Sequence, residues 1–327
     1  MPSRLVHDAN SLPLASAACA AQAGARAGVN RLRGIVLSVC AAAAVLTTAG
    51  CNGVAVQVSY RNADLVAMSR VDKYLALDDA QDAIARRQMQ QFFVWHRYEE
   101  LPEYSRWLRS LKPQFARPMS TDEFERVIAE LERRADRSVA RFAEDMAPVV
   151  TSLQPRQLAH MRKAMDERTR ELTKEYLDPS PAKQREERFD DLLRVAERIW
   201  GSLSAEQKRA LRAASDARPL DHALLVAERR RVQDDSVATF AKVQKLALPA
   251  PRAAGELIAL YDRTRPSPDP MRRAYFDQVM RGSAVALAQL SASATPAQRK
   301  HALEFLESLA TDFDELSRRK VVASRAE

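Results

Sequence analysis

Glycine is scarce in this sequence of 327 residues: it occurs 8 times. Only four glycines follow Cys51, at Gly53, Gly201, Gly255 and Gly282. A nucleotide-binding α/β fold needs glycines at its phosphate-binding turn, and β-hairpins use them where φ is positive. Alanine, arginine, glutamate, leucine and glutamine, which favour helices, are frequent instead. The composition therefore predicts an all-α protein.

Cysteine is absent from most of the chain. Its three occurrences are Cys19, Cys40 and Cys51, so no thiol nucleophile is available beyond the first sixth of the sequence. A chain without cysteines suits an oxidising compartment. The later histidines are His96, His160, His222 and His301. They stand singly and far apart, so no metal-binding pair such as H-E-x-x-H exists, and no metal is expected.

A strong excess of one charge is also missing. The net charge is +8, and four arginines against one aspartate lie in the first 50 residues. The remaining mild excess is spread along segments where arginine alternates with glutamate and aspartate. Such patterns are typical of solvated helix faces with i,i+4 pairs. Because no recognition motif accompanies the charge, a nucleic-acid partner is not expected.

Residues 29–50 have the pattern of a signal peptide. Arg31 and Arg33 are followed by an apolar stretch, 34–46, that is too short to span a bilayer comfortably. Small residues, 47–50, then precede Cys51. This arrangement resembles the lipobox of bacterial lipoproteins. The resemblance implies cleavage just before Cys51 and a covalent lipid on that residue, with palmitate-type acyl chains that anchor the protein to a membrane.

Two details shape this prediction. Thr48 stands where a lipobox usually has leucine, and cleavage after Ala55 with release of a soluble protein is the alternative. Asn52 follows the cysteine where an inner-membrane retention signal would prefer aspartate, so we expect the protein to be anchored at the periplasmic face of the outer membrane.

Residues 1–28 precede a complete signal sequence. We interpret them as a non-native extension with Val29 as the true start, an unusually long n-region being the alternative.

Beyond a lipidated cysteine and tether, residues 51–59, helical periodicity continues to the end. We expect residues 60–327 to form a single all-helical domain, an antiparallel multi-helix bundle or stack with short connections. A Pro-rich stretch, 264–270, is a possible hinge. The expected helices are 61–75, 79–98, one restarting at Leu101-Pro102, a long one from Ser120 or Thr121, one from Pro155, one between the 178–181 turn and Gly201, 204–216, 219–247, 252–264, 269–292 and 295–320.

A short element recurs at helix starts. It reads LDDAQ at 77–81, LQPRQ at 153–157, LSAEQ at 203–207 and ATPAQ at 294–298. A polar cap followed by a glutamine that reaches back to free amides explains the pattern. The element, above all LSAEQ, also resembles the LTxxQ motif of periplasmic chaperones of the Spy and CpxP type. That resemblance implies binding of unfolded clients on a concave, basic helical surface.

One segment carries a more specific signature. WHRYEELPEY at 95–104, with YLALDDAQ at 74–81 and the W-G-x-L-x-x-x-Q run at 200–207, resembles the DUF6279 family of Gram-negative lipoproteins. The resemblance extends over most of the chain after Cys51. It implies a helical lipoprotein and brings no established activity or catalytic residues.

The same segment provides the candidate binding residues. They are Trp95, His96, Arg97, Glu99, Glu100 and Tyr104. As a binding site they would form a polar cluster beside an aromatic floor that includes Tyr98. The alternative is a helix–turn–helix corner locked by a buried ion pair and aromatic rings.

The sequence favours a non-catalytic envelope lipoprotein that binds a protein partner or client, in an adaptor or chaperone-like role. No cofactor other than the lipid on Cys51 is expected. The alternative is an envelope hydrolase, for example directed at peptidoglycan, with Glu99 or Glu100 as the acid and His96 or Arg97 as its partner. No G-x-S-x-G elbow supports an enzyme, and abundant carboxylates alone do not select a catalytic pair.

Overall fold

The computed structural model describes residues 57, 60, 62–264 and 267–318. This part of the chain is helical throughout and contains no β-strand, which confirms the all-α prediction. The elements are α4 (Ala63–Leu75), α5 (Asp79–Trp95), the π-helical turn η2 (His96–Glu100), α6 (Leu101–Phe115), α7 (Thr121–Ser152), α8 (Pro155–Leu177), α9 (Pro181–Trp200), α10 (Ala205–Asp216), α11 (His222–Lys245), α12 (Ala250–Arg263), α13 (Pro270–Ser293) and α14 (Pro296–Arg318).

Most helix starts are set by local side chains. Ser120 and Glu123 form a reciprocal capping box at the start of α7, and Ser180 accepts a hydrogen bond from the Lys183 amide at the start of α9. These bonds satisfy amides that have no partner inside the helix. The predicted helix starts therefore agree closely with the structure.

One predicted boundary is wrong. We expected a new helix at Leu101-Pro102, but the chain passes from α5 into α6 without a break, through the wide turn η2, where the Leu101 amide bonds to the His96 carbonyl. Proline has no amide to give to the carbonyl four residues earlier, and its ring crowds that carbonyl. A single π turn relieves the conflict and lets the helix continue.

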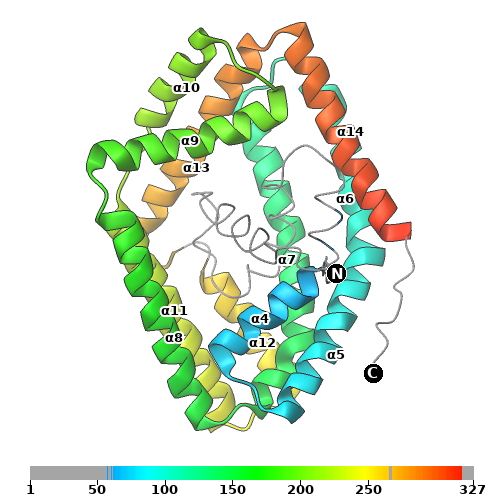
Figure 1. The fold of residues 1–327 in the computed structure, drawn as a ribbon, viewed down its shortest axis with the longest axis vertical. Helices are drawn as coiled ribbons and strands as arrows, with labels where there is room; N and C mark the ends of the chain where they lie inside the picture. The colour runs from blue at the N-terminus through cyan, green and yellow to red at the C-terminus, as the bar shows by residue number, and fades with distance from the viewer. Residues whose placement is uncertain (1–56, 58–59, 61, 265–266, 319–327) are drawn as a thin grey trace, which may run out of the picture.

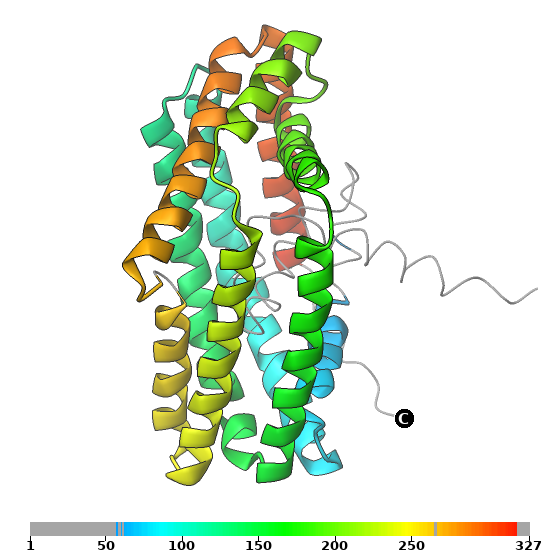
Figure 2. The ribbon, with the colours of Figure 1, turned by 90° about the vertical axis from the view of Figure 1, so that its left-hand side faces the viewer.

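The helices pack as antiparallel pairs. Viewed along the shortest axis, α5 and α6 rise along one side and α14 descends beside α6, while α8 and α11 run side by side along the other (Figure 1). The long helix α7 lies between these sides, with α12 against its C-terminal half and α13 against its N-terminal half. The side view shows the same elongated body, in which most helices run nearly parallel to the long axis and α9 runs across it (Figures 1 and 2).

The core has two parts. The larger joins α4–α10 to α13 and α14, and its most buried large side chains include Trp200 and Phe92. Trp200 contacts Phe115 and Phe124 with ring centroids 6.2 Å apart. The smaller part lies between α7, α11 and α12 and consists mainly of alanine, with Val243 and Leu257. Alanine lets these helices approach closely, because a ridge of small side chains fits into the groove of its neighbour.

The first described residues contact the body of the protein. Gln57 donates a hydrogen bond to Glu315 near the end of α14 at 2.7 Å, and Tyr60 is buried in the core. The proposed signal peptide, Cys51 and the N-terminal extension lie outside the described residues. Of the helices described, none combines the length and apolar character needed to cross a membrane.

The segment predicted as a possible hinge is fastened on both sides of residues 265–266. Ser267 donates to the buried Glu228 at 3.3 Å, and Arg273 donates to the Ser267 carbonyl. On the other side, Arg231 donates to the Arg263 carbonyl at 3.0 Å. Glu228 thus links α11 to the connection between α12 and α13.

Candidate functional site

The π turn divides the WHRYEELPEY segment into an inward and an outward half. The side chains of His96 and Glu100 are buried, whereas Tyr98 and Glu99 are exposed. A π turn carries more residues per turn than an α-helix, so it rotates the side chains that follow it relative to those before it. Such turns are frequent at functional sites.

His96 belongs to the core. Its Nδ1 shares a 2.9 Å hydrogen bond with the hydroxyl of Tyr60, whose ring stacks on the imidazole at 5.8 Å. Burial lowers the pKa of His96 to about 4 and raises the pKa of Tyr60. Both side chains are therefore neutral near pH 7. This pair fixes the first described residues against the π turn.

Glu100 is the buried acid of the segment, with 1% of its surface exposed. Arg137 of α7 forms an ion pair with it at 2.8 Å. Burial raises the pKa of Glu100, while Arg137 and Arg134 act in the opposite direction. The pair joins the buried Glu100 of the π turn to Arg137 of α7, whose side chain is 54% exposed. Removal of the arginine would leave a buried carboxylate without its partner, which destabilises the fold.

Arginines of α7 also cover the aromatic rings of the neighbouring helices. Arg134 lies over Tyr104 at 5.8 Å and over Trp107 at 5.3 Å, and Arg141 lies over Trp95 at 5.7 Å. Each such contact contributes about 0.5–2 kcal/mol, depending on exposure. Tyr104 is buried and packs on Phe313 of α14. It therefore connects the segment to the C-terminal helix.

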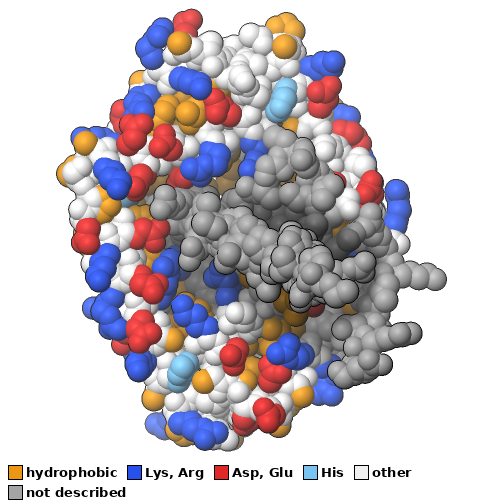
Figure 3. Space-filling model, viewed as in Figure 1, with side chains coloured by type: hydrophobic (Ala, Val, Ile, Leu, Met, Phe, Trp, Pro, Cys, Tyr) orange, Lys and Arg blue, Asp and Glu red, His pale blue; other side chains and the backbone are white. Residues whose placement is uncertain are grey.

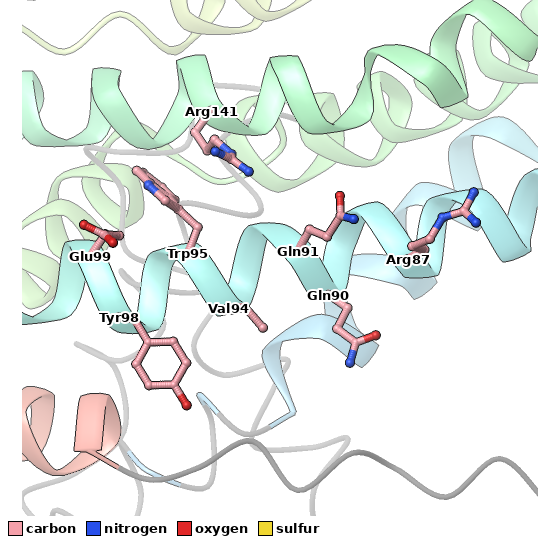
Figure 4. Close-up of a pocket in the computed structure, with 8 residues that line it drawn as sticks. All are labelled: Arg87, Gln90, Gln91, Val94, Trp95, Tyr98, Glu99 and Arg141. Atoms are coloured by element: carbon pink, nitrogen blue, oxygen red, sulfur yellow. The ribbon is translucent and has the colours of Figure 1, made fainter.

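The outward half lines an open recess between α5, the π turn and α7. The recess is lined by Arg87, Gln90, Gln91, Val94, Trp95, Tyr98, Glu99 and Arg141. Arg141 of α7 points toward Trp95 of α5 (Figure 4). Glu99, in the π turn that follows α5, projects from the same side as Trp95. Val94 and Tyr98 are exposed, at 37% and 43% of their surface. One of the eight lining residues is a carboxylate.

The structure thus separates the predicted binding residues. Trp95 and Glu99 line the recess, whereas His96, Glu100 and Tyr104 are buried. Arg97 is half-buried, with its guanidinium over the Tyr60 ring at 5.5 Å. The sequence did not identify Arg141 of α7 as a neighbour of Trp95, because contacts between helices carry no short-range sequence signal. Arg87 and Gln91 lie on the same helix as Trp95 and share its face by helical spacing.

The recurring glutamine element forms two buried amide pairs. Gln81 and Gln157 donate to each other's carbonyl oxygens, at 3.2 and 2.6 Å. Gln207 and Gln298 do the same, both at 2.9 Å. We call these pairs the first and second clasp. The predicted capping role is present at each helix start, and the pairing between helix starts is additional to it.

Each clasp also reaches the loop that precedes the partner helix. Gln157 donates to the Leu75 and Ala76 carbonyls, and Gln81 donates to the Ser152 carbonyl. In the second clasp, Gln207 donates to the Ser293 carbonyl and Gln298 donates to the Ser202 carbonyl. The glutamines are buried and engaged within the chain, so they serve the fold.

Charges are mixed over the surface that can be seen. Basic and acidic side chains alternate over the visible described face in Figure 3, as the sequence pattern indicated. Within the described ranges, no cluster of three or more His, Cys, Asp and Glu side chains is placed to hold a metal ion.

Comparison of the sequence with known proteins assigns the chain to a protein family. A sequence model described as "Family of unknown function (DUF6279)" matches residues 73–245. This range is more than half of the chain and contains all three segments that indicated the family, so the chain belongs to the DUF6279 family. No curated protein and no solved structure matches it.

Proposed function

We propose that the chain is a lipid-anchored protein of the cell envelope that binds a protein partner through the recess and catalyses no reaction. One observation carries the proposal. Around the π turn, Glu99 projects outward on the side of Trp95 and Arg141, and Tyr98 projects outward from the opposite side of the same helix (Figure 4), while His96 and Glu100 of the segment are engaged in the core.

The side chains of the recess suit a protein partner. Tryptophan, tyrosine and arginine contribute most of the binding energy at protein interfaces, because they combine large apolar area with hydrogen-bonding groups. Trp95 and Tyr98 supply that area here, and Arg87 and Arg141 flank it. Arg141 is held in place by Asp145 at 2.9 Å, so it loses little freedom when a partner binds.

The same geometry gives less support to an envelope hydrolase. General acid–base catalysis needs its groups to converge on one substrate position, and glycoside hydrolysis generally needs two carboxyl groups facing one cleft. Glu99 lines the recess, whereas Glu100 pairs with Arg137 and His96 bonds to Tyr60. These contacts direct the acid and the imidazole of the segment into the core, so we favour binding.

The proposed anchor would hold the recess near a membrane. Tyr60 lies nine positions after Cys51, and a chain of this length spans at most roughly 30 Å. Tyr60 packs directly against the π turn. A lipid on Cys51 would therefore keep the recess within a short distance of the bilayer.

Photo-cross-linking in intact cells tests the binding surface. A photoreactive residue at Gln91, which is exposed in the recess, should give one discrete adduct. The same residue at Lys300, a strongly exposed position on α14, is the control and should not give that adduct. Adding Tyr98→Ala should reduce the Gln91 adduct at least about fivefold, as expected for loss of a hot-spot side chain. Equal adducts from both positions, or an adduct insensitive to Tyr98→Ala, would contradict the proposal.

Acyl labelling tests the proposed lipid anchor and membrane localisation independently of the binding surface. The full chain should incorporate a labelled fatty acid in a globomycin-sensitive manner and fractionate with the outer membrane, and Cys51→Ala should abolish both properties. An unlabelled, soluble wild-type protein would instead support cleavage after Ala55 and contradict the anchor. The two experiments thus test the binding surface and the lipid anchor separately, and either part of the proposal can be contradicted without the other.

A further inference from the structure

Arg218 is a buried cation between α10 and α13, far along the chain from the recess. It follows the end of α10, and 5% of its surface is exposed. Its Nη1 donates to Ser283 Oγ at 2.7 Å, and its Nη2 donates to Ser215 Oγ at 3.3 Å. Both acceptors are neutral hydroxyls, so these contacts satisfy hydrogen bonds without neutralising the charge.

The neighbouring helix is shaped to receive this side chain. Gly282 of α13 lies against the Arg218 stem, and a Cβ atom added at Gly282 would lie 2.5 Å from Arg218 Cγ. That distance is well inside van der Waals contact, so any larger residue would displace the arginine. The burial of Arg218 therefore depends on one of the few glycines in the chain.

A second arginine lies beside the first. Arg188 of α9 donates from Nη1 to the Arg218 carbonyl at 3.0 Å and to the Pro219 carbonyl at 3.1 Å. The nearest acidic oxygen is on Asp216, 3.9 Å from Arg188 Nη2. Among the described residues, the Nε atoms of Arg188 and Arg218 are both buried without a hydrogen-bond partner.

The local charge balance is positive. Burial, with a smaller contribution from the like charge of Arg188, lowers the pKa of Arg218 to about 10. Burial also lowers the pKa of Arg188, against the influence of Asp216. Asp216 lies 3.9 Å from Arg188, and the charges that act on Arg218 are those of Arg188 and Tyr275. The carbonyls at the C-terminus of α10 offset part of this charge, but buried charges are ordinarily paired with an ion of opposite sign.

We propose that Arg188 and Arg218 form a binding site for a small phosphate-type oxyanion. The planar guanidinium group offers donors in a fixed geometry that matches phosphate oxygens, and two such groups can hold one anion. Arg188 is partly exposed, at 14% of its side chain, and gives access from solvent. Ser215 and Ser283 orient Arg218, and the anion supplies the missing negative charge.

Calorimetric titration of inorganic phosphate at constant ionic strength tests the site. The protein is the full chain carrying Cys51→Ala, which removes the proposed acylation site from the experiment. Saturable binding is expected, and Arg188→Gln should weaken it at least about tenfold, as for loss of a charged hydrogen-bond donor. Arg194→Gln on the same helix is the matched control, because Arg194 forms a surface pair with Asp191 at 2.9 Å. It should bind within about twofold of the wild type. Circular dichroism confirms that each variant keeps its helices.

A vesicle assay separates free phosphate from a lipid headgroup. If phosphate binds but phosphatidylglycerol vesicles do not recruit the protein beyond phosphatidylcholine vesicles, the ligand is a free oxyanion. Recruitment by phosphatidylglycerol that is lost in Arg188→Gln and competed by phosphate identifies a headgroup. Absence of binding to both probes overturns the proposal, as does an Arg188→Gln variant that binds like the wild type.

Discussion

The two clasps use the same hydrogen bonds but different backbones. In the first, the residue after α4 is Ala76, with φ 47° and ψ 60°, an ordinary left-handed conformation. In the second, the residue after α9 is Gly201, with φ 73° and ψ −157°, a region that only glycine enters without strain. The difference shows that the glutamine pair fixes where two helices start, while the preceding loop decides which residue types are tolerated.

The clasps also differ in what they connect. Gln81 and Gln157 both lie within the range that matches the family, 73–245, whereas Gln298 lies beyond it. The second clasp therefore ties the matched region to α14, which packs along α6. Breaking each clasp should show whether the C-terminal helix stabilises the family region.

The largest effect should come from Gln157→Ala. This change leaves the Leu75 and Ala76 carbonyls and the Gln81 amide without their buried partner, and we expect it to lower the free energy of unfolding by about 3–4 kcal/mol. Gln298→Ala should cost about 1 kcal/mol less, because Gln298 reaches one loop carbonyl, that of Ser202, and not two. Urea unfolding measures both. Equal losses would mean that the amide pair alone carries the stabilisation.

Acid should weaken the half of the molecule that contains the first clasp. His96 has a pKa of about 4 in the folded protein, below its unfolded value near 6.5, so folding favours the neutral form. The stabilisation is full above pH 6.5 and is lost as pH falls toward 4, by about 3 kcal/mol in total. Urea unfolding at pH 7 and pH 4 measures it. His96→Phe should flatten this dependence, and an unchanged slope would assign the acid sensitivity to other groups.

Gly201→Ala should damage the second clasp. Alanine is strained at the positive φ of this position, and its Cβ would lie 3.2 Å from the ring of His301. We therefore expect the free energy of unfolding to fall by about 2 kcal/mol. Thermal unfolding of this variant can be compared with Gly255→Ala, where a Cβ atom meets nothing within 4 Å. A glycine inside a helix costs stability, so the control should be slightly stabilised. Destabilisation of both variants to the same degree would contradict the argument.

The smallest effect is a gain at the first clasp. Ala76 holds a positive φ of 47°, and Ala76→Gly removes this strain, which is worth about 1 kcal/mol in the left-handed region. The flexibility that glycine adds to the unfolded chain reduces the net gain. A rise in the unfolding midpoint is expected, and a fall would show that the loop has no backbone strain to relieve.

Much of the fold could be predicted from the sequence. Helical periodicity and capping residues located nearly every helix, because both act within four residues along the chain. The passage from α5 to α6 was the exception. Pro102 indicated a boundary, but the packing of Leu101 and Tyr104 in the core keeps the helix continuous through a π turn.

The candidate site was less predictable. The signature at 95–104 was evident, and yet the sequence alone could not tell that His96 and Glu100 face the core while Tyr98 and Glu99 face solvent. A π turn shifts the register of the side chains that follow it, so helical spacing no longer predicts the face on which they lie. The partners of the segment, Tyr60, Arg137 and Arg141, come from other helices.

Composition, periodicity and caps by themselves determined an all-helical chain, the starts of its helices and its family, because these properties depend on neighbouring residues. Tertiary structure alone decided that four capping glutamines pair as two clasps, that one signature is divided between core and recess, and that two arginines share a buried corner. Each of these features joins residues that are between 30 and 91 positions apart in the sequence. Their contacts depend on how helices pack, which local sequence does not specify.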